Sequence, residues 1–391
     1  MKIVLVTQSY YPRPGGVTEH VHHSAIGLRR LGHDVTIVTS RFDYGHKETP
    51  GVVRVGRNVL VPINGAWVNM TVGIKLARDL RRVFDRIQPD VIHTHCPMAP
   101  TLPLLTLHVA PDNCRIVGTY HAAAKRNFAY WLFKPYLRRM ARRLDTRIAV
   151  SETARELANK YVPGDFEIIP NGVDCSRFSP ANKPLDHLRD DRFNILYAGR
   201  LDKRKGLKYL FRALAIVEKH TRRRLRLIVV GDDGPRRRLL PKLPTSVELH
   251  YAGVVPAELL PRYFASGHLF CAPAIESESF GIVLVEAMAS GIPVVGTSIP
   301  GYLAILKHRS NALVVPPRDP RGLATAITEL IDDDVLRERI RHNALEFVTA
   351  YSWNGIVTQL EAVYDGGKPA AMDSNEEHSA VLQNPIQVQK A

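Results

Sequence analysis

Short apolar runs rich in valine and isoleucine alternate along the chain with longer stretches of helical periodicity. This alternation predicts buried parallel strands joined by crossover helices, the pattern of an α/β protein. The first set of runs lies at residues 3–7, 35–39, 91–94, 115–119 and 147–150, and the second at residues 195–198, 225–230, 247–252, 269–272 and 294–297. We therefore expect two α/β units in tandem, each with its own parallel sheet.

Helical periodicity is clearest after the first strand of the second unit. Apolar side chains recur there at Leu207, Leu210, Phe211, Leu214 and Val217, a stripe typical of a helix that packs on a sheet. Periodicity is lost between residues 170 and 191, where Pro, Asn, Gly and Asp cluster. We expect domains at residues 1–175 and 176–350, a helix at 351–366 that crosses back to the first domain, and a disordered tail at 367–391.

Composition and charge narrow the classes of partner. The 391 residues, 45% of them apolar and 23% charged, are typical of a globular protein rather than a fibrous or disordered one. A formal net charge of +15 favours anionic partners, which include nucleotides, nucleic acids and acidic membrane surfaces. We find no helix-turn-helix, zinc-finger or RNP signature and expect no nucleic acid partner. No apolar window is long enough to cross a bilayer, so we expect any membrane contact to be peripheral.

Cysteine usage points to a reducing compartment. The four cysteines, Cys96, Cys114, Cys175 and Cys271, lie far apart, without the paired spacing of a zinc site. Their density is too low for a disulfide scaffold, so the cytoplasm is the expected location.

Two loops carry glycines or cations where a parallel sheet would bind a ligand. In PRPGGVTEHV, Gly15 and Gly16 precede a predicted helix, whose backbone amides could approach a phosphate. In YAGRLDKRKGL, Arg200 and Lys205 follow a predicted strand and could hold a diphosphate. From these residues alone, the first segment could equally be an ordinary glycine turn, and the cations of the second could be solvated surface charge.

The segment ESESFGIVLVEAMASGIPVV is the most informative. Glu278 and Glu286 are eight residues apart, and a helix that starts near Gly281 would place both within reach of one elongated ligand. A carboxylate suits paired sugar hydroxyls. The alternative is one capping acid and one solvated acid.

Together these segments resemble glycosyltransferase family 4, whose α/β architecture is the GT-B fold: two Rossmann-like domains with parallel sheets that face each other across a cleft. The resemblance runs from Met1 to about Gly366 through PGGV, PNGVD, GRLDKRKG, VVGDDGP and ESFGIVLVE. The chain is most similar to the bacterial phosphatidylinositol mannosyltransferases, through PGGVTEHV, VPINGAW, DVIHTH, GTYHAA and ESFGIVLVEAM.

The resemblance implies a role for each matching residue. His121 and Glu278 would act at the reacting sugar, and the expected donor-binding residues are Gly16, Arg200, Lys205, Ser279, Phe280, Gly281, Ile282 and Glu286. It also implies retaining transfer, in which the acceptor hydroxyl attacks on the face that the diphosphate leaves. The cations and a helix dipole would stabilise the departing phosphate, and we assign no side chain as a covalent nucleophile.

Histidine clusters raise the question of a metal. His20, His22 and His23 lie together in the sequence, as do His93 and His95. No nearby cysteine or carboxylate set completes a tetrahedral site, and the cationic loop can replace a diphosphate-bound metal. We therefore expect no metal and no cofactor besides the nucleotide-sugar donor substrate.

Basic residues concentrate in the first domain. Lys75, Arg78, Arg81 and Arg82 lie on a predicted helix, and residues 121–147 hold eight Lys or Arg against one acid, interleaved with aromatic residues. Such a surface can bind acidic lipid headgroups, although a solvated helix face with core aromatics is the alternative. The resemblance implies a basic helix at the first of these positions, so we expect the first domain to bind the acceptor and the membrane.

The leading hypothesis is a retaining hexosyltransferase, peripheral on the cytoplasmic face of the cell membrane, that moves mannose from GDP-mannose to an inositol phospholipid or similar lipid. The alternative is a family 4 enzyme that uses a UDP-sugar, such as UDP-N-acetylglucosamine, with a soluble inositol phosphate or other glycan acceptor. The segment GVVPAELL departs from the acidic groups that often meet guanine in the lipid enzymes, which leaves the donor open. The GT-B fold also serves nucleotide-sugar epimerases, but those lack a reason for a basic aromatic membrane face.

Overall fold

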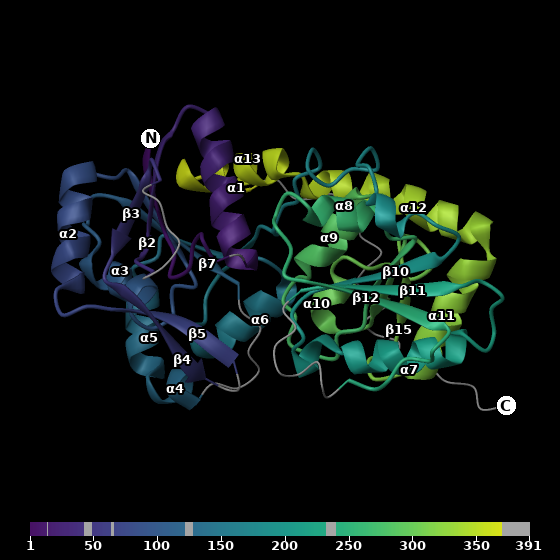
Figure 1. Ribbon diagram of the computed structural model, residues 1–391. Coiled ribbons are helices and arrows are strands. Elements are labelled where there is room, and N and C mark those ends of the chain that lie inside the picture. Colours follow the sequence, from purple (N-terminus) through teal and green to yellow (C-terminus); the bar gives the residue numbers. More distant parts are fainter. Residues whose placement is uncertain (14, 43–48, 64–65, 122–127, 232–239, 370–391) are drawn as a thin grey trace.

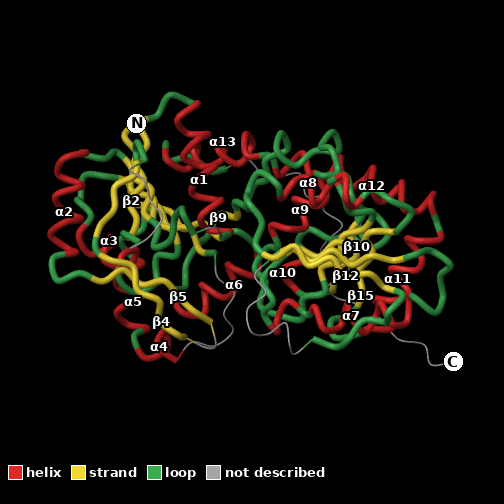
Figure 2. Tube along the Cα trace, in the orientation of Figure 1, coloured by secondary structure: helices red, strands yellow, loops and turns green. Residues whose placement is uncertain are grey.

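The computed structural model describes residues 1–13, 15–42, 49–63, 66–121, 128–231 and 240–369. It has two halves, each built around a parallel sheet with helices on both faces (Figures 1 and 2). The predicted tandem α/β architecture is confirmed. The predicted tail lies mostly beyond residue 369, outside the described residues.

The first sheet has seven parallel strands in the order β3-β2-β1-β6-β7-β8-β9. The five predicted strands are all present in it, within one or two residues of the expected ends. The bounds are β1 Lys2–Val6, β2 Asp34–Ser40, β3 Val52–Val55, β6 Val91–His95, β7 Arg115–Tyr120, β8 Thr146–Ala149 and β9 Glu167–Ile168. The pattern missed β3 and β9, the two edge strands, which are only four and two residues long.

Alternating side chains of β1 supply the cores on the two faces of this sheet. Val4 and Val6 join one buried cluster with the helices of one face, whereas Ile3 and Leu5 join a second cluster on the other face. The helices that follow the strands are α1 Gly16–Arg30, α2 Leu76–Ile87, α3 Leu102–Val109, α4 Phe128–Leu132, α5 Lys134–Ala141 and α6 Glu152–Tyr161. A strand buried on both faces needs apolar residues at every position, which is why β1 reads as an unbroken apolar run.

A hairpin outside the parallel sheet was not predicted. Strands β4 (Arg57–Ile63) and β5 (Ala66–Val72) pair antiparallel with each other and with no strand of the large sheets. The sequence Asn64-Gly65 between them is a strong hairpin signal that could have revealed the pair.

The second sheet has six parallel strands in the order β12-β11-β10-β13-β14-β15. Its bounds are β10 Phe193–Ala198, β11 Leu225–Val230, β12 Val247–Gly253, β13 Leu269–Ala272, β14 Val294–Thr297 and β15 Leu313–Val315. The helices are α7 Leu207–Val217, α8 Leu260–Ala265, α9 Ile282–Ala289, α10 Pro300–Leu303, α11 Pro320–Asp332 and α12 Asp334–Val348. All five apolar residues of the predicted stripe on α7 are buried.

The last described helix, α13 (Trp353–Tyr364), lies in the first half of the molecule beside α1 (Figure 1). The two helices meet at Gly27, where a Cβ atom would lie 2.5 Å from Cγ2 of Val357, so only glycine permits this approach. His33 Nε2 also lies 2.8 Å from Glu361 Oε1. The chain therefore starts in the first half, passes through the second, and ends its described part on the first.

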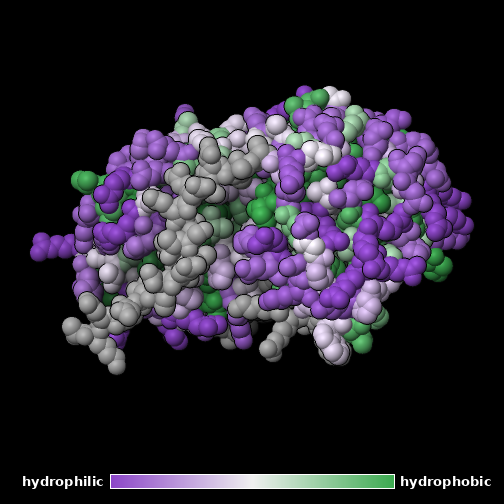
Figure 3. Space-filling view, turned by 180° about the vertical axis from the view of Figure 1, so that it is seen from behind, coloured by the Kyte–Doolittle hydropathy of each residue, from purple (hydrophilic) through white to green (hydrophobic). Residues whose placement is uncertain are grey.

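The described helices were compared with the length and apolar character of a transmembrane helix. None of the described helices combines the length and the apolar character needed to cross a bilayer. Hydrophilic residues cover most of the face seen in Figure 3, with apolar residues in scattered patches.

Candidate functional site

The two halves are joined at the residues that the sequence selected. The Ser279 hydroxyl donates a 2.7 Å hydrogen bond to the backbone oxygen of His121, which directly follows β7. The Ser151 hydroxyl, which caps α6, donates a 2.5 Å hydrogen bond to the backbone oxygen of Ser279. The fold therefore brings His121 of the first domain against the segment before α9 of the second.

Helix α9 begins at Ile282, directly after Gly281, close to the predicted start. Gly281 has φ 86° and ψ 62°, and a Cβ atom there would lie 2.6 Å from Cε1 of Tyr302. Glycine is therefore needed for this turn. A Cβ atom on Gly16, the first residue of α1, would lie 3.9 Å from Cδ1 of Ile282. The N-termini of α1 and α9 thus approach each other, and both present backbone amides and the positive ends of helix dipoles.

Lys205 and Glu278, both predicted to meet the donor, contact each other directly. Lys205 Nζ lies 3.0 Å from the Glu278 carboxylate, and both side chains are largely shielded. The turn Lys203–Lys205 ends at Gly206, whose φ is 70°. A Cβ atom on Gly206 would lie 1.8 Å from the Pro273 backbone oxygen, so glycine lets this cationic loop lie against the end of β13.

Arg200 and Phe280 differ in what they can offer a ligand. Arg200 is exposed in the loop after β10, and its backbone oxygen accepts a 2.9 Å hydrogen bond from the Tyr197 hydroxyl. The Phe280 side chain is buried in the hydrophobic core near the Tyr351 ring. The Phe280 side chain is therefore structural, and only its backbone can serve the donor role expected from the sequence.

Glu286 lies on α9 in a largely enclosed position. Burial of its carboxyl raises the pKa to about 8, against an ordinary value of 4.5, with Arg177 opposing the rise and Glu19 adding to it. Arg177 Nη1 lies 3.4 Å from Glu19 Oε2, and Arg177 Nη2 donates a 2.8 Å hydrogen bond to the Ala257 backbone oxygen. Sequence reasoning missed Glu19 and Arg177, since nothing in their spacing indicates that they meet.

Three histidines from separate segments form one group beside the join. His20 lies on α1, His95 ends β6, and His121 follows β7; His95 Nδ1 is 3.1 Å from His121 Nε2. His20 Nδ1 lies 2.9 Å from Oδ1 of Asn171, a residue of the PNGVD segment. Burial lowers the pKa of His20 to about 4 and those of His95 and His121 well below the ordinary value, so all three are neutral at pH 7.

The predicted basic helix is α2, and Lys75 directly precedes its first residue. Lys75, Arg78, Arg81 and Arg82 are all exposed, whereas Leu76, Leu80, Val83 and Phe84 are buried. The helix therefore presents cations on one face and packs with the other.

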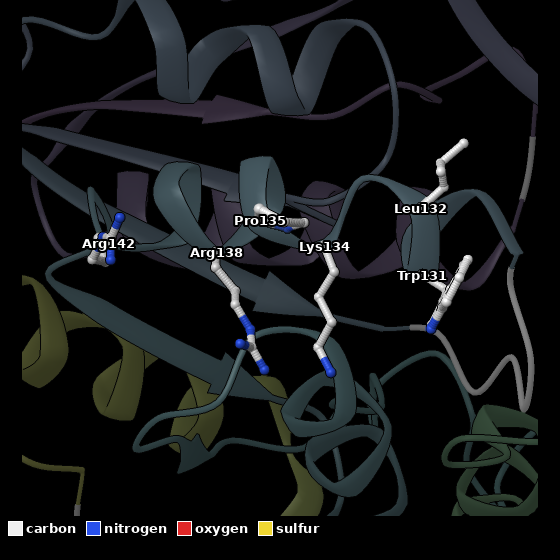
Figure 4. A pocket seen from close by; sticks show the side chains of 6 residues that line it. All are labelled: Trp131, Leu132, Lys134, Pro135, Arg138 and Arg142. Carbon is white, nitrogen blue, oxygen red and sulfur yellow. The ribbon is translucent and has the colours of Figure 1, made fainter.

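A second basic surface, the α4–α5 surface, is formed by Trp131, Leu132, Phe133, Lys134, Tyr136, Arg138 and Arg142. Trp131 is 64% exposed and Phe133 56% exposed, which is unusual for such large apolar side chains. A hollow of about 600 Å³ lies over this surface, and Lys134 and Arg138 extend to the same side of it (Figure 4). Lys125 and Arg126 of the predicted basic run lie outside the described residues.

Comparison with known proteins identifies the family. Residues 14–177 match the model of Glycosyltransferase Family 4, and residues 181–347 match that of Glycosyl transferases group 1. The phosphatidyl-myo-inositol mannosyltransferase of Mycolicibacterium smegmatis is 32% identical over 368 residues, or 93% of this chain and 94% of that protein. The D-inositol 3-phosphate glycosyltransferase of a Nocardioides species is 30% identical over 54% of this chain and 51% of that protein.

Solved glycosyltransferase structures share the fold of this chain. A solved glycosyltransferase structure from Rickettsia africae superposes with a TM-score of 0.72 at 19% identity, over 93% of this chain and 98% of that one. The chain has two parallel sheets and matches family models along nearly its whole length, so it belongs to glycosyltransferase family 4 and is a hexosyltransferase of the GT-B fold.

Proposed function

We propose that this enzyme transfers mannose, with retention, from GDP-mannose to an inositol phospholipid on the cytoplasmic face of the cell membrane. The observation that carries the proposal is the hydrogen bond between Ser279 and the His121 backbone, which joins the expected donor segment to the expected reacting histidine. The similarity to the Mycolicibacterium enzyme supports the choice of sugar and acceptor.

The donor diphosphate would bind at the α9 N-terminus. Backbone amides there and the cations of Arg200 and Lys205 suit a doubly charged leaving group. Lys205 is paired with Glu278 at 3.0 Å, and the diphosphate would compete for its ammonium group. Glu278 would then accept hydrogen bonds from sugar hydroxyls, and Glu286 would accept those of the ribose.

Transfer would follow from this placement. The bond between the anomeric carbon and the phosphate oxygen breaks, the acceptor hydroxyl oxygen bonds to the anomeric carbon on the same face, and the departing phosphate takes the hydroxyl proton. Fixed cations and the helix dipole stabilise the phosphate as its charge develops. His121 is neutral, because burial lowers its pKa, so it can hydrogen-bond to a sugar hydroxyl without repelling the cationic transition state.

The first domain would bind the membrane surface. The exposed cations of α2 and the aromatic and cationic residues of the α4–α5 surface both suit an acidic lipid surface, where each cation contributes about 1 kcal/mol. The α4–α5 surface belongs to the same domain as His121 and follows it in the chain, so this domain would also hold the acceptor. Liposome sedimentation with the variant Arg78→Glu/Arg81→Glu should show weaker binding to acidic vesicles, and unchanged binding would contradict this role.

The roles assigned to Glu278 and Arg200 predict different effects of their substitution on transfer and on nucleotide binding. Glu278→Ala should abolish transfer and leave nucleotide binding largely intact, since the carboxylate is assigned to the sugar. Arg200→Ala should weaken both, since the guanidinium is assigned to the diphosphate. Calorimetry with GDP and a transfer assay on each variant test the pair, and an equal loss of nucleotide affinity in both would contradict the assignment.

A UDP-sugar with a soluble inositol phosphate is the second candidate. The partial similarity to the Nocardioides enzyme favours it, as does the segment after β12, where Pro256 and Ala257 stand in place of the acidic groups that often meet guanine. Calorimetric titration of GDP, GDP-mannose, UDP and UDP-N-acetylglucosamine separates the candidates. Tighter binding of the guanine pair supports the first proposal, and tighter binding of the uridine pair overturns its donor.

A further inference from the structure

We propose that His20, His95 and His121 form a binding site for a divalent transition metal of the zinc class. One ring nitrogen from each residue lies within 4.8 Å of the others, with His20 and His95 buried and His121 half-buried. From the sequence we expected no metal, because each histidine cluster lacked ligands. The fold instead takes one histidine from each of three distant segments, and no cysteine or carboxylate is needed.

The spacing of the rings fits one shared ion. Their centroids are 5.3 Å apart for His20 and His95, 4.8 Å for His20 and His121, and 5.4 Å for His95 and His121. Three imidazoles on one tetrahedral zinc ion, with Zn–N bonds of about 2.0–2.1 Å, place their ring centroids about 5 Å apart. The approach of His95 Nδ1 to His121 Nε2, 3.1 Å, is also close to the nitrogen spacing around such an ion.

The protonation pattern also suits a ligand set. His20 Nδ1 faces the Asn171 amide oxygen at 2.9 Å and must donate to it, which leaves the lone pair on Nε2. Within the described part of the chain, no hydrogen-bond partner reaches the buried Nε2 of His20. Unsatisfied buried nitrogens are costly. A metal-bound histidine commonly has its other nitrogen fixed by an oxygen acceptor, which is the position of Asn171.

The donor set selects the class of metal and its effect. Neutral imidazoles suit zinc, cobalt, nickel or copper ions, whereas magnesium and manganese favour oxygen ligands. Three protein ligands leave a fourth position open. An ion held by His121 would occupy the ring that the proposed reaction needs at the sugar. We therefore infer that micromolar zinc inhibits transfer; this consequence rests on the proposed function, whereas metal binding itself does not.

Cobalt titration of the metal-stripped full-length protein tests the site. We expect one Co²⁺ per chain with the visible absorption of a tetrahedral ion, and we expect Zn²⁺ to displace it. His20→Asn and His95→Asn should each abolish this band. Asn171→Ala keeps all three ligands but loses the acceptor for His20, so its affinity should fall about 10- to 100-fold.

A matched control lies on the same helix. His22 has Nδ1 bonded to the Tyr10 hydroxyl at 2.8 Å and is outside the three ligands, so His22→Asn should bind Co²⁺ like the wild type. Circular dichroism identifies any variant that fails to fold, and Asn171→Ala then carries the test because its ligands are intact. Absence of the cobalt band in the wild type, or a band that survives both ligand substitutions, would overturn the site.

The transfer assay separates this site from the proposed function. If the cobalt band forms but no donor and acceptor pair gives product, the proposed function fails and the metal site stands. If transfer proceeds and zinc at saturating concentration leaves its rate unchanged, the inhibitory role is wrong. If zinc inhibits the wild type and His20→Asn is resistant, both hold.

Discussion

Replacement of Glu286 by glutamine should change how the stability of the enzyme depends on pH. Burial raises the pKa of this carboxyl to about 8, so it stays protonated in the folded protein where the unfolded chain, at an ordinary 4.5, is ionised. The stability that this group contributes is present below the unfolded pKa and is lost as pH rises through the folded pKa. The folded state therefore becomes less stable from about pH 4.5 to about pH 8 through this group.

The magnitude follows from linkage. Each pH unit within that window costs about 1.4 kcal/mol, so the change from about pH 6 to about pH 8 is about 3 kcal/mol at most. Glutamine has nearly the same shape and does not titrate. Between pH 6 and pH 8, the wild type should therefore lose up to about 3 kcal/mol more unfolding free energy than Glu286→Gln.

Urea unfolding of both proteins at several pH values measures this difference, and titrations of all other groups cancel in it. Glu258→Gln is the matched control, because Glu258 is an exposed carboxylate of the same domain. The wild type and the control should lose stability together as pH rises, while Glu286→Gln loses less. A stability difference that stays constant from pH 6 to pH 8 would refute the argument that Glu286 is held protonated.

Three further predictions concern the site and its support. Gly281→Ala should lower the unfolding free energy by about 2 kcal/mol or more, since φ is 86° and the new methyl would meet a tyrosine ring; Gly355→Ala, inside α13, should be neutral or stabilising in the same urea titration. Burial lowers the pKa of His93 to about 3, so the stability that this neutral ring contributes is fully present above pH 6.5 and is lost as pH falls toward 3. In urea unfolding at a series of acidic pH values, His93→Asn should therefore lose less unfolding free energy than the wild type. Lys205→Met should weaken GDP binding by about tenfold or more in calorimetry, because it removes a charged hydrogen-bond donor, and unchanged affinity would exclude a diphosphate role.

Much of the fold is predictable from the sequence because parallel strands buried on both faces leave long apolar runs. Strand β1 and helix α7 are clear cases, since nearly every residue of one and a full stripe of the other are buried. The β4–β5 hairpin escaped because neither of its strands belongs to a doubly covered sheet. Its exposed Val59 and Leu60 break the alternation that marks a half-buried strand.

The candidate site is predictable only in parts. Local signals identified the glycine turn at Gly281 and the acidic and basic residues near it, because a helix N-terminus and a strand end have recognisable sequences. The contact between Glu19 and Arg177, and the meeting of His20 with His121, depend on how distant segments pack. No spacing rule connects residues whose neighbours are set by the whole fold.

The most direct test of the central claim is a transfer reaction with the purified full-length enzyme and acidic vesicles that contain phosphatidylinositol. GDP-mannose and UDP-N-acetylglucosamine are supplied separately, and the lipid product is analysed by mass spectrometry, with Glu278→Ala as the inactive control. We predict that GDP-mannose gives phosphatidylinositol with one added hexose and that the uridine donor gives none. Product from the uridine donor alone, or no lipid product from either, would contradict the account.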